Sequence, residues 1–263
     1  MKQFETILVD EPSPGVLLVT LNRPEFSNAF NTQTGRDLYD VFHPLELEHR
    51  RYRCVVLTGA GEKAFCAGGD LKERKTLTEE QWVLQHELFE RTFRSILNCP
   101  IPVLVAANGS AFGGGLELMM LCDFAYASRT SRFALTEVSL GIMPGGAGTQ
   151  TLARAVGEAR AKELILTATP FSAEEALSWG VVNRLFEPGE VLDKTLEAAQ
   201  RIAANAPLSV RQAKHSIHYG LQMDLRSGMM FELEAYQRMV TSEDRREGIL
   251  AFNEKRKPVF KGK

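Results

Sequence analysis

The chain has 263 residues, of which 44% are hydrophobic, so it can bury a large core as one domain with an appendage or as two small domains. Its 31 Lys and Arg residues against 33 Asp and Glu residues produce no strong overall field. The composition therefore argues against nucleic acid and against an anionic membrane as partners.

The N-terminus and the cysteines favour a cytoplasmic protein. Residues 1–10 carry charges at Lys2, Glu5 and Asp10 and lack the apolar run of a signal peptide. No stretch approaches the roughly 18 apolar residues of a membrane span. The cysteines are widely spaced without a Cys-x-x-Cys pair, which predicts reduced thiols that fill the core: Cys54, Cys66, Cys99 and Cys122.

Short apolar runs alternate with longer amphipathic segments along the first 206 residues. Apolar runs bounded by turn residues predict strands at 6–9, 16–21, 54–57, 103–107 and 124–127. A helical period predicts helices at 32–45, 79–97, 114–121, 173–179 and 190–204. This alternation predicts an α/β body.

Almost everything after Pro207 has a helical pattern. The boundary at Asn205-Ala206-Pro207 predicts a body of residues 1–206 and a helical region of residues 207–263. The apolar face of these helices includes Ile217, Leu221, Met229, Met230, Phe231, Leu233, Tyr236, Met239 and Val240. Such a face needs a partner surface, and two remain open: the protein's own body and another subunit.

Residues 64–72 follow the apolar run at 54–57 and are predicted to form a loop that leaves a buried strand. Its glycines, Gly68 and Gly69, permit a backbone that presents N–H groups inward. Taken alone, the segment is more simply a tight turn. Cys66 is interpreted as a small core residue and not as a nucleophile, because no identified base would lower the pKa of its thiol.

A second glycine-rich segment, residues 106–117, follows the predicted strand 103–107 and continues into a helix. Two strand-to-helix loops of this kind could each direct one backbone N–H group to the same point. That arrangement stabilises the charge that develops on an acyl oxygen. The two segments together therefore suggest an oxyanion hole.

Two glutamates border glycine-rich segments. Glu117 follows Gly113-Gly114-Gly115, and Glu137 precedes the glycines of residues 141–146. A pair of carboxyl groups beside an oxyanion hole suggests acid/base chemistry. The alternative is that Glu117 is a solvated helix charge and Glu137 a member of an ion pair on a loop, because most glutamates lie at protein surfaces.

Five stretches, in order, resemble the crotonase superfamily, also called the enoyl-CoA hydratase/isomerase family. They are Leu21-Asn22-Arg23-Pro24 with Asn28-Ala29, then 65–72, 108–117, 137–150 and 243–256. The resemblance extends over nearly the whole chain. It implies an α/β crotonase-like (ClpP/crotonase) superhelix of repeated ββα units, with a C-terminal helical region that builds homotrimers, commonly stacked into hexamers.

The resemblance also implies an acyl-CoA thioester substrate whose carbonyl oxygen lies between the N–H groups of Gly69 and Gly114. Many relatives have Ala at the position of Gly69, and glycine still supplies the N–H group. Coenzyme A would be part of the substrate, with no further cofactor and no metal. The residues implied at the coenzyme are Arg23 and Lys72 as phosphate-binding cations, Ala67 as acceptor for the adenine amino group, and Ala29, Asp70, Leu71 and Lys255. Lys255, with Arg256 as the alternative, would reach a neighbouring subunit's ligand.

Both glutamates occupy the positions that hydratases use, so the resemblance implies an enoyl-CoA hydratase. The reaction is reversible syn addition of water to a trans-2-enoyl-CoA, giving a 3-hydroxyacyl-CoA. Glu137 would deliver the proton to the α-carbon and Glu117 would orient the water, with the roles interchangeable in a concerted step. Two close carboxyl groups in a dry pocket have different pKa values, because both cannot easily be charged there at the same time.

The acyl group and some rival functions stay open. Residues 70–74 and 247–252 resemble the subgroup of 3-methylglutaconyl-CoA hydratases of leucine breakdown, but the sequence places no cation for a second substrate carboxylate. A short or medium unbranched enoyl-CoA is the alternative. Other open functions are another crotonase-type reaction, such as isomerisation or the dehydration of an unusual acyl-CoA, and RNA binding without turnover. The near-neutral charge and the two glutamates argue against RNA binding.

Overall fold

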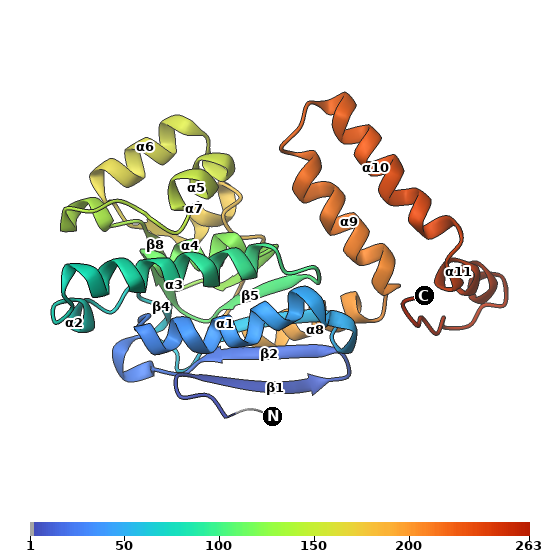
Figure 1. The fold of residues 1–263 in the computed structure, drawn as a ribbon, viewed down its shortest axis with the longest axis horizontal. Helices are drawn as coiled ribbons and strands as arrows, with labels where there is room; N and C mark the ends of the chain where they lie inside the picture. Colours follow the sequence, from blue (N-terminus) through green and yellow to red (C-terminus); the bar gives the residue numbers. More distant parts are fainter. Residues whose placement is uncertain (1–2) are drawn as a thin grey trace.

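Two β-sheets form the centre of the body in the computed structural model, which describes residues 3–263 (Figure 1). The larger sheet has the strand order β1-β2-β3-β5-β7-β10, and the smaller has the order β4-β6-β8-β9. The larger sheet contains β1 (Ile7–Ser13), β2 (Val16–Leu21), β3 (Cys54–Gly59), β5 (Val103–Ala107), β7 (Phe124–Ser128) and β10 (Arg184–Phe186). The smaller sheet contains β4 (Ala64–Cys66), β6 (Ser110–Phe112), β8 (Arg132–Ala134) and β9 (Phe171–Ser172).

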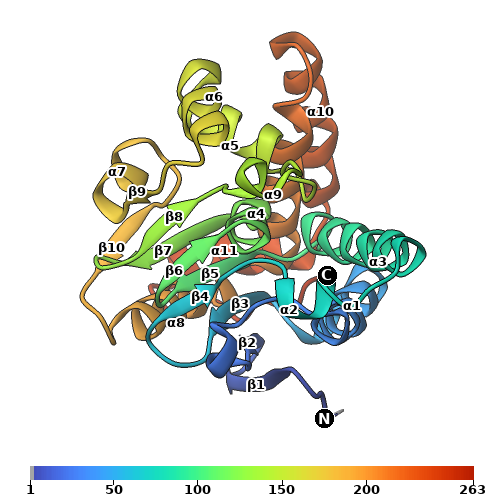
Figure 2. The ribbon, with the colours of Figure 1, turned by 90° about the vertical axis from the view of Figure 1, so that its left-hand side faces the viewer.

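The chain repeatedly adds one strand to each sheet before it forms a helix. β3 and β4 are followed by α2 (Leu71–Arg74) and α3 (Glu79–Leu97), and β5 and β6 are followed by α4 (Gly114–Leu121). β7 and β8 then lead to the 3-10 helix η3 (Glu137–Leu140). Corresponding strands of successive units pair in parallel, and Figure 2 shows the units side by side. The superhelix of ββα units that the resemblance implies is therefore present.

Helices cover both faces of the larger sheet, so its central strands are fully buried. Val55 and Leu57 of β3 pack in a core that α1 (Thr32–Leu47) and α3 share. Cys54 and Val56 pack in a second core against α8 (Val191–Ala203). Because successive side chains of a strand point to opposite faces, a strand buried on both sides has a continuous apolar sequence and not an alternating one.

The remaining helices surround this centre and form the C-terminal region. They are η1 (Pro24–Phe26), η2 (His49–Arg51), α5 (Gly148–Val156), α6 (Glu158–Thr167), α7 (Ala173–Ser178), α9 (Pro207–Gly220), α10 (Leu225–Val240) and α11 (Glu243–Asn253). Within residues 3–263, none of the helices has the length and apolar character needed to cross a bilayer.

The long periodic segments were predicted more accurately than the short strands. α3 and α4 begin and end where the sequence predicts, whereas β4, β6, β8, β9 and β10 were missed. The prediction of a loop over residues 64–72 is wrong at its start, because Ala64–Cys66 forms β4 and pairs with β6. β1 also extends to Ser13, beyond the predicted end at residue 9, and contains Pro12; an edge strand tolerates this residue because a proline there breaks no ladder hydrogen bond in the sheet interior.

Helices α9 and α10 form a pair that projects away from the sheets (Figure 1). Their large apolar side chains are exposed in the single chain: Ile217, Leu221, Leu225, Met229, Met230, Leu233 and Tyr236. The sequence left two partner surfaces open for this apolar face, the protein's own body and another subunit. The body does not cover these side chains.

Candidate active site

A cavity of about 650 Å³ lies between α3, the beginning of α4 and the segment 136–146. Its wall contains both predicted acid/base residues, Glu117 and Glu137, and both predicted oxyanion donors, Gly69 and Gly114. Aromatic side chains of α3 contribute an apolar surface. The fold thus brings the predicted residues from three segments of the sequence to one cavity.

Glu117 lies in the first turn of α4 with only 4% of its surface exposed. Its Oε1 accepts hydrogen bonds from the N–H groups of Gly146 and Gly148, each at 2.8 Å. Burial raises the pKa of Glu117 to about 7, and the charge of Glu137 adds to this, while the two hydrogen bonds and Arg74 act in the opposite direction. Oε1 is therefore fixed, and the carboxyl group can gain or lose a proton near neutral pH.

Glu137 begins η3, and both of its carboxyl oxygens are buried without a hydrogen-bond partner among residues 3–263. Burial raises the pKa of this carboxyl group, although the charge of Arg74 acts in the opposite direction. A buried polar atom without a partner carries a free-energy cost of about 1–3 kcal/mol. The orientation of Glu137 toward the cavity therefore favours a function in binding or proton transfer.

The N–H groups of Gly69 and Gly114 are both available for a ligand. Phe30 pairs with the chain on either side of Gly69, donating to Gly68 O at 2.7 Å and accepting from Asp70 N at 2.6 Å, so the pairing does not use the N–H group of Gly69. Gly114 is the first residue of α4, where an N–H group has no acceptor within the helix. Neither group donates a backbone hydrogen bond within residues 3–263.

The two donors are also close together. A Cβ atom built on Gly114 would lie 4.0 Å from the Gly69 nitrogen. One residue further, a Cβ atom on Gly115 would lie 2.2 Å from the Cys66 carbonyl oxygen, a separation that no side chain can adopt. Glycine at this position allows α4 to begin directly against β4. The geometry suits two donors to one oxyanion.

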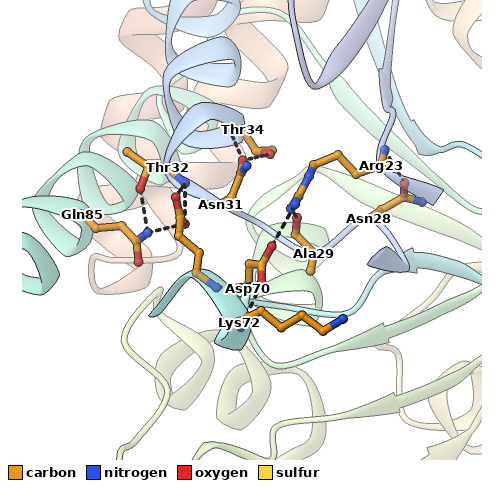
Figure 3. A network of polar contacts seen from close by, with 10 residues as sticks. Arg23, Asn28, Ala29, Asn31, Thr32, Thr34, Asp70, Lys72 and Gln85 are labelled. Carbon is orange, nitrogen blue, oxygen red and sulfur yellow. Dashed lines mark hydrogen bonds and ion pairs between the residues drawn. The ribbon is translucent and has the colours of Figure 1, made fainter. Parts of the chain in front are cut away.

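Arg23 is already paired within the chain (Figure 3). Its Nη2 lies 2.9 Å from Asp70 Oδ2, and its Nη1 donates to the Ala29 carbonyl oxygen at 2.6 Å. Asp70 also accepts from the N–H groups of Lys72 and Glu73 at the start of α2. Burial acts to raise the pKa of Asp70, but these hydrogen bonds outweigh it and the pKa is lowered. Arg23 and Asp70 therefore hold the loop that carries Gly69.

The other residues predicted at the coenzyme differ in position. Ala67 and Leu71 line the cavity, and the Ala67 carbonyl oxygen accepts no backbone hydrogen bond within residues 3–263. Lys72 is exposed, with its Nζ 5.6 Å from the ring centroid of Phe26. Lys255 follows α11, which Figure 1 shows at the opposite end of the molecule from α2. The structure therefore brings these residues together with the exception of Lys255.

Sequence reasoning missed two polar residues of the cavity region, Arg74 and Gln85. Arg74 lines the cavity, and Gln85 is 4% exposed and bonds to it. Two signals were present. Arg74 follows Asp70 by one helical turn, and Gln85 stands on the buried stripe of α3 with Phe89, Thr92 and Ile96. A glutamine on a buried stripe indicates a buried polar partner.

Cys66 is fully buried beside the glycine loop. Burial raises the pKa of its thiol to about 12. A thiol that stays protonated is a poor nucleophile, so the position suits packing and not covalent catalysis.

Comparisons with known proteins agree with this geometry. The family model described as "Enoyl-CoA hydratase/isomerase" matches residues 11–263. A short-chain-enoyl-CoA hydratase of Clostridium acetobutylicum is 41% identical over 242 residues, covering 92% of this chain and 92% of the relative. A mitochondrial methylglutaconyl-CoA hydratase of Mus musculus is 33% identical over 258 residues, covering 97% of this chain and 82% of the relative. The crystal structure of an enoyl-CoA hydratase from Bacillus anthracis has a TM-score of 0.96 at 42% identity, covering 98% of this chain and 100% of that chain. The fold predicted from the resemblance is thereby confirmed.

The raised pKa of Glu117 predicts a pH-dependent stability. Glu117 keeps its proton up to about pH 7 in the folded chain, but loses it near 4.5 when unfolded. The folded state therefore binds more protons between these values, and the free energy of unfolding should fall as pH rises through this window, by roughly 3 kcal/mol at most. Urea unfolding across the window should show a flatter profile for Glu117→Gln, which cannot ionise.

The control for this prediction is Glu158→Gln, which replaces an exposed carboxylate on α6. Its pH profile should follow that of the unmodified chain. Parallel profiles for the unmodified chain and Glu117→Gln would show that Glu117 keeps no proton in the folded state at neutral pH.

Proposed function

The chain belongs to the enoyl-CoA hydratase/isomerase family, and from that premise we propose that it hydrates a trans-2-enoyl-CoA to a 3-hydroxyacyl-CoA. One observation carries the proposal. Glu117 and Glu137 are both buried at the cavity, and both have raised pKa values. An addition of water needs two groups that exchange protons at neutral pH, and these two are suited to it.

The proposed reaction begins with the thioester carbonyl oxygen bound to the N–H groups of Gly69 and Gly114. Glu117, held through Oε1, uses its other oxygen to orient a water molecule over the β-carbon and takes its proton as the water attacks. Negative charge moves through the α-carbon to the thioester oxygen, where the two N–H groups stabilise it. Glu137, in its protonated form, then gives a proton to the α-carbon. The pair titrates as a unit, so the roles can exchange.

The acyl group has two candidates. An unbranched short-chain enoyl-CoA is supported by the relative from Clostridium acetobutylicum. A 3-methylglutaconyl-CoA is supported by the relative from Mus musculus and by the presence of Arg74, a cation, in the cavity wall. Isomerisation of an enoyl-CoA remains the alternative reaction within the family; it moves one proton and adds no water, so it does not require two glutamates.

We propose that the coenzyme A part of the substrate lies over the loop that carries Gly69. Lys72 supplies an exposed positive charge for its phosphates, and the free carbonyl oxygen of Ala67 receives the adenine amino group. Ala29 and Leu71 flank this loop, and Arg23 acts through its ion pair with Asp70. Lys255 lies too far away in the same chain and would act only on a neighbouring subunit's ligand.

We also propose that residues 207–263 form the oligomerisation region and residues 1–206 the catalytic body. The exposed apolar side chains of α9 and α10 support association between subunits, because such a face is costly to leave in water, and the resemblance implies a homotrimer or a dimer of trimers. A cytoplasmic location remains an expectation from the sequence.

Replacement of either glutamate tests the reaction. Glu117→Gln and Glu137→Gln should each lower kcat for crotonyl-CoA hydration by about 10²–10⁴-fold, because each removes one proton-transfer group. Loss of the absorbance of the conjugated thioester measures the rate. Glu158→Gln, at an exposed position, should retain full activity.

Two results would contradict the hydratase. One is no hydration of crotonyl-CoA by the unmodified chain, and the other is a rate that neither glutamate affects. Conversion of a trans-3-enoyl-CoA to its 2-enoyl isomer, without formation of a hydroxyacyl product, would identify an isomerase instead.

Loss of Lys72 tests the position of the coenzyme. Lys72→Ala should raise KM for crotonyl-CoA by about 2- to 5-fold, which is the range for an exposed ion pair. KM for crotonyl-pantetheine, which has no nucleotide phosphates, should not change. Lys75→Ala, an exposed lysine of the same segment, is the matched control. An equal rise in KM for both substrates would place the phosphates elsewhere.

Light scattering tests the assembly. The unmodified chain should have three or six times the chain mass of 29.3 kDa. The double variant Met229→Arg with Leu233→Arg should shift the mass toward the monomer, because it places charges on the exposed face of α10. Leu166→Arg, at an exposed position on α6, should leave the mass unchanged. A monomeric unmodified chain would contradict the proposed assembly.

A further inference from the structure

Arg74 places a positive charge in a largely apolar part of the cavity. Its guanidinium carbon lies 4.6 Å from the ring centroid of Trp82 and 5.8 Å from that of Phe89, and the side chain is half-buried. The partial removal of a guanidinium from water has a cost that these ring contacts repay only in part. A charge retained in such a place calls for a function.

The guanidinium is held in position by a buried network. Its Nε donates to Gln85 Oε1 at 3.1 Å. The amide nitrogen of Gln85 in turn donates to Thr32 Oγ1 and to Glu73 Oε2, each at 2.8 Å. Figure 3 shows Gln85 beside Thr32 in this network. Because Gln85 is 4% exposed and its amide is fixed at both ends, the direction of the guanidinium is also fixed.

The two terminal nitrogens of Arg74 have no partner within residues 3–263. No carboxylate of this part of the chain lies within 4.0 Å of them, and they donate no hydrogen bond to it. Two parallel N–H groups on one face match the two oxygens of a carboxylate. The structure therefore holds a preformed half of a bidentate ion pair at the cavity wall.

The charges around the cavity allow an anion to enter. Burial raises the pKa of Glu117 to about 7, so this carboxyl group carries only part of a negative charge at neutral pH, and burial also raises the pKa of Glu137. The two rim glutamates are each paired one helical turn further along α3: Glu87 with Arg91 at 3.8 Å, and Glu90 with Arg94. Burial acts to lower the pKa of Arg74, but a guanidinium stays protonated in proteins.

We propose that Arg74 recognises a second carboxylate on the acyl group, so that the preferred substrate is a 2-enoyl-CoA with an acidic acyl chain. The thioester would bind at Gly69 and Gly114, and the distal carboxylate would pair with the terminal nitrogens of Arg74. This inference assumes that the reaction at the double bond is the proposed hydration. It differs from a purely electrostatic function of Arg74, in which the guanidinium would only adjust Glu117 and Glu137.

Two substrates of matched shape separate these two functions. Glutaconyl-CoA carries a carboxylate where 5-methylhex-2-enoyl-CoA carries an isopropyl group of the same shape. The unmodified chain should have the higher kcat/KM for glutaconyl-CoA. Arg74→Met, which keeps an unbranched apolar stem and removes the guanidinium and its charge, should lower kcat/KM for glutaconyl-CoA by about 10- to 100-fold, the range for hydrogen bonds to a charged group. The value for the isopropyl substrate should change far less.

Two further variants sharpen the result. Arg74→Lys, which keeps the charge but loses the paired geometry, should fall between the unmodified chain and Arg74→Met for glutaconyl-CoA. Lys75→Met removes an adjacent exposed charge and should change neither substrate. Equal losses on both substrates in Arg74→Met would overturn the inference and assign Arg74 to the glutamates. So would the absence of a preference for glutaconyl-CoA in the unmodified chain, a result that does not depend on any variant folding.

A binding measurement separates the inference from the reaction. Calorimetry with glutaryl-CoA and 5-methylhexanoyl-CoA, which cannot be hydrated, should show tighter binding of the acidic ligand, and Arg74→Met should abolish the difference. If this preference is present but no enoyl-CoA is hydrated, the hydratase fails and the recognition by Arg74 stands. If crotonyl-CoA is hydrated but the preference is absent, the hydratase stands and the recognition by Arg74 fails.

Discussion

The site depends on the close approach of α4 to β4. Gly115 lies so near the Cys66 carbonyl oxygen that a side chain cannot fit between them. This contact joins two loops that are distant in sequence, and it sets how near the N–H groups of Gly69 and Gly114 come to each other. It also sets where α4 begins, and Glu117 lies in the first turn of that helix. The two proposed oxyanion donors and one of the proposed acid/base carboxyl groups are therefore fixed relative to one another, as a preorganised site requires.

A second constraint is electrostatic. Glu117 and Glu137 are buried at the cavity beside the half-buried Arg74, and the charge of Arg74 opposes the rise in pKa that burial causes in both carboxyl groups. Backbone N–H groups fix one oxygen of Glu117, while Glu137 has no such support within residues 3–263. Two carboxyl groups of the same chemistry therefore have different surroundings. Different surroundings of this kind favour different pKa values for two neighbouring carboxyl groups, which the proposed acid/base reaction requires.

The sequence predicted those parts of the fold and site that local patterns determine. α3 has a long helical period, α4 follows directly on a glycine run, and the two glutamates stand beside glycine-rich segments, so these features could be identified. β4, β6 and β8 are three residues long and are stabilised by pairing with each other across distant segments, which no local pattern records. Arg74 was missed for a related reason. Its position depends on Gln85, which lies on another helix, and on the absence of a carboxylate partner, which only the folded structure reveals.

Residue 69 bears on two separate features of the cavity: its side-chain position faces the guanidinium of Arg74, and its backbone N–H group is a proposed oxyanion donor. A Cβ atom there would lie 3.0 Å from the guanidinium carbon of Arg74 and 3.1 Å from its Nη1, so alanine would force the guanidinium to shift. The N–H group would be unaffected, because it belongs to the backbone. In evolutionary terms, one methyl group at this position would act on the proposed recognition of the acyl chain and would leave the proposed oxyanion donor unchanged. A change at residue 69 therefore has its consequence at the guanidinium of residue 74 and not at the backbone N–H group.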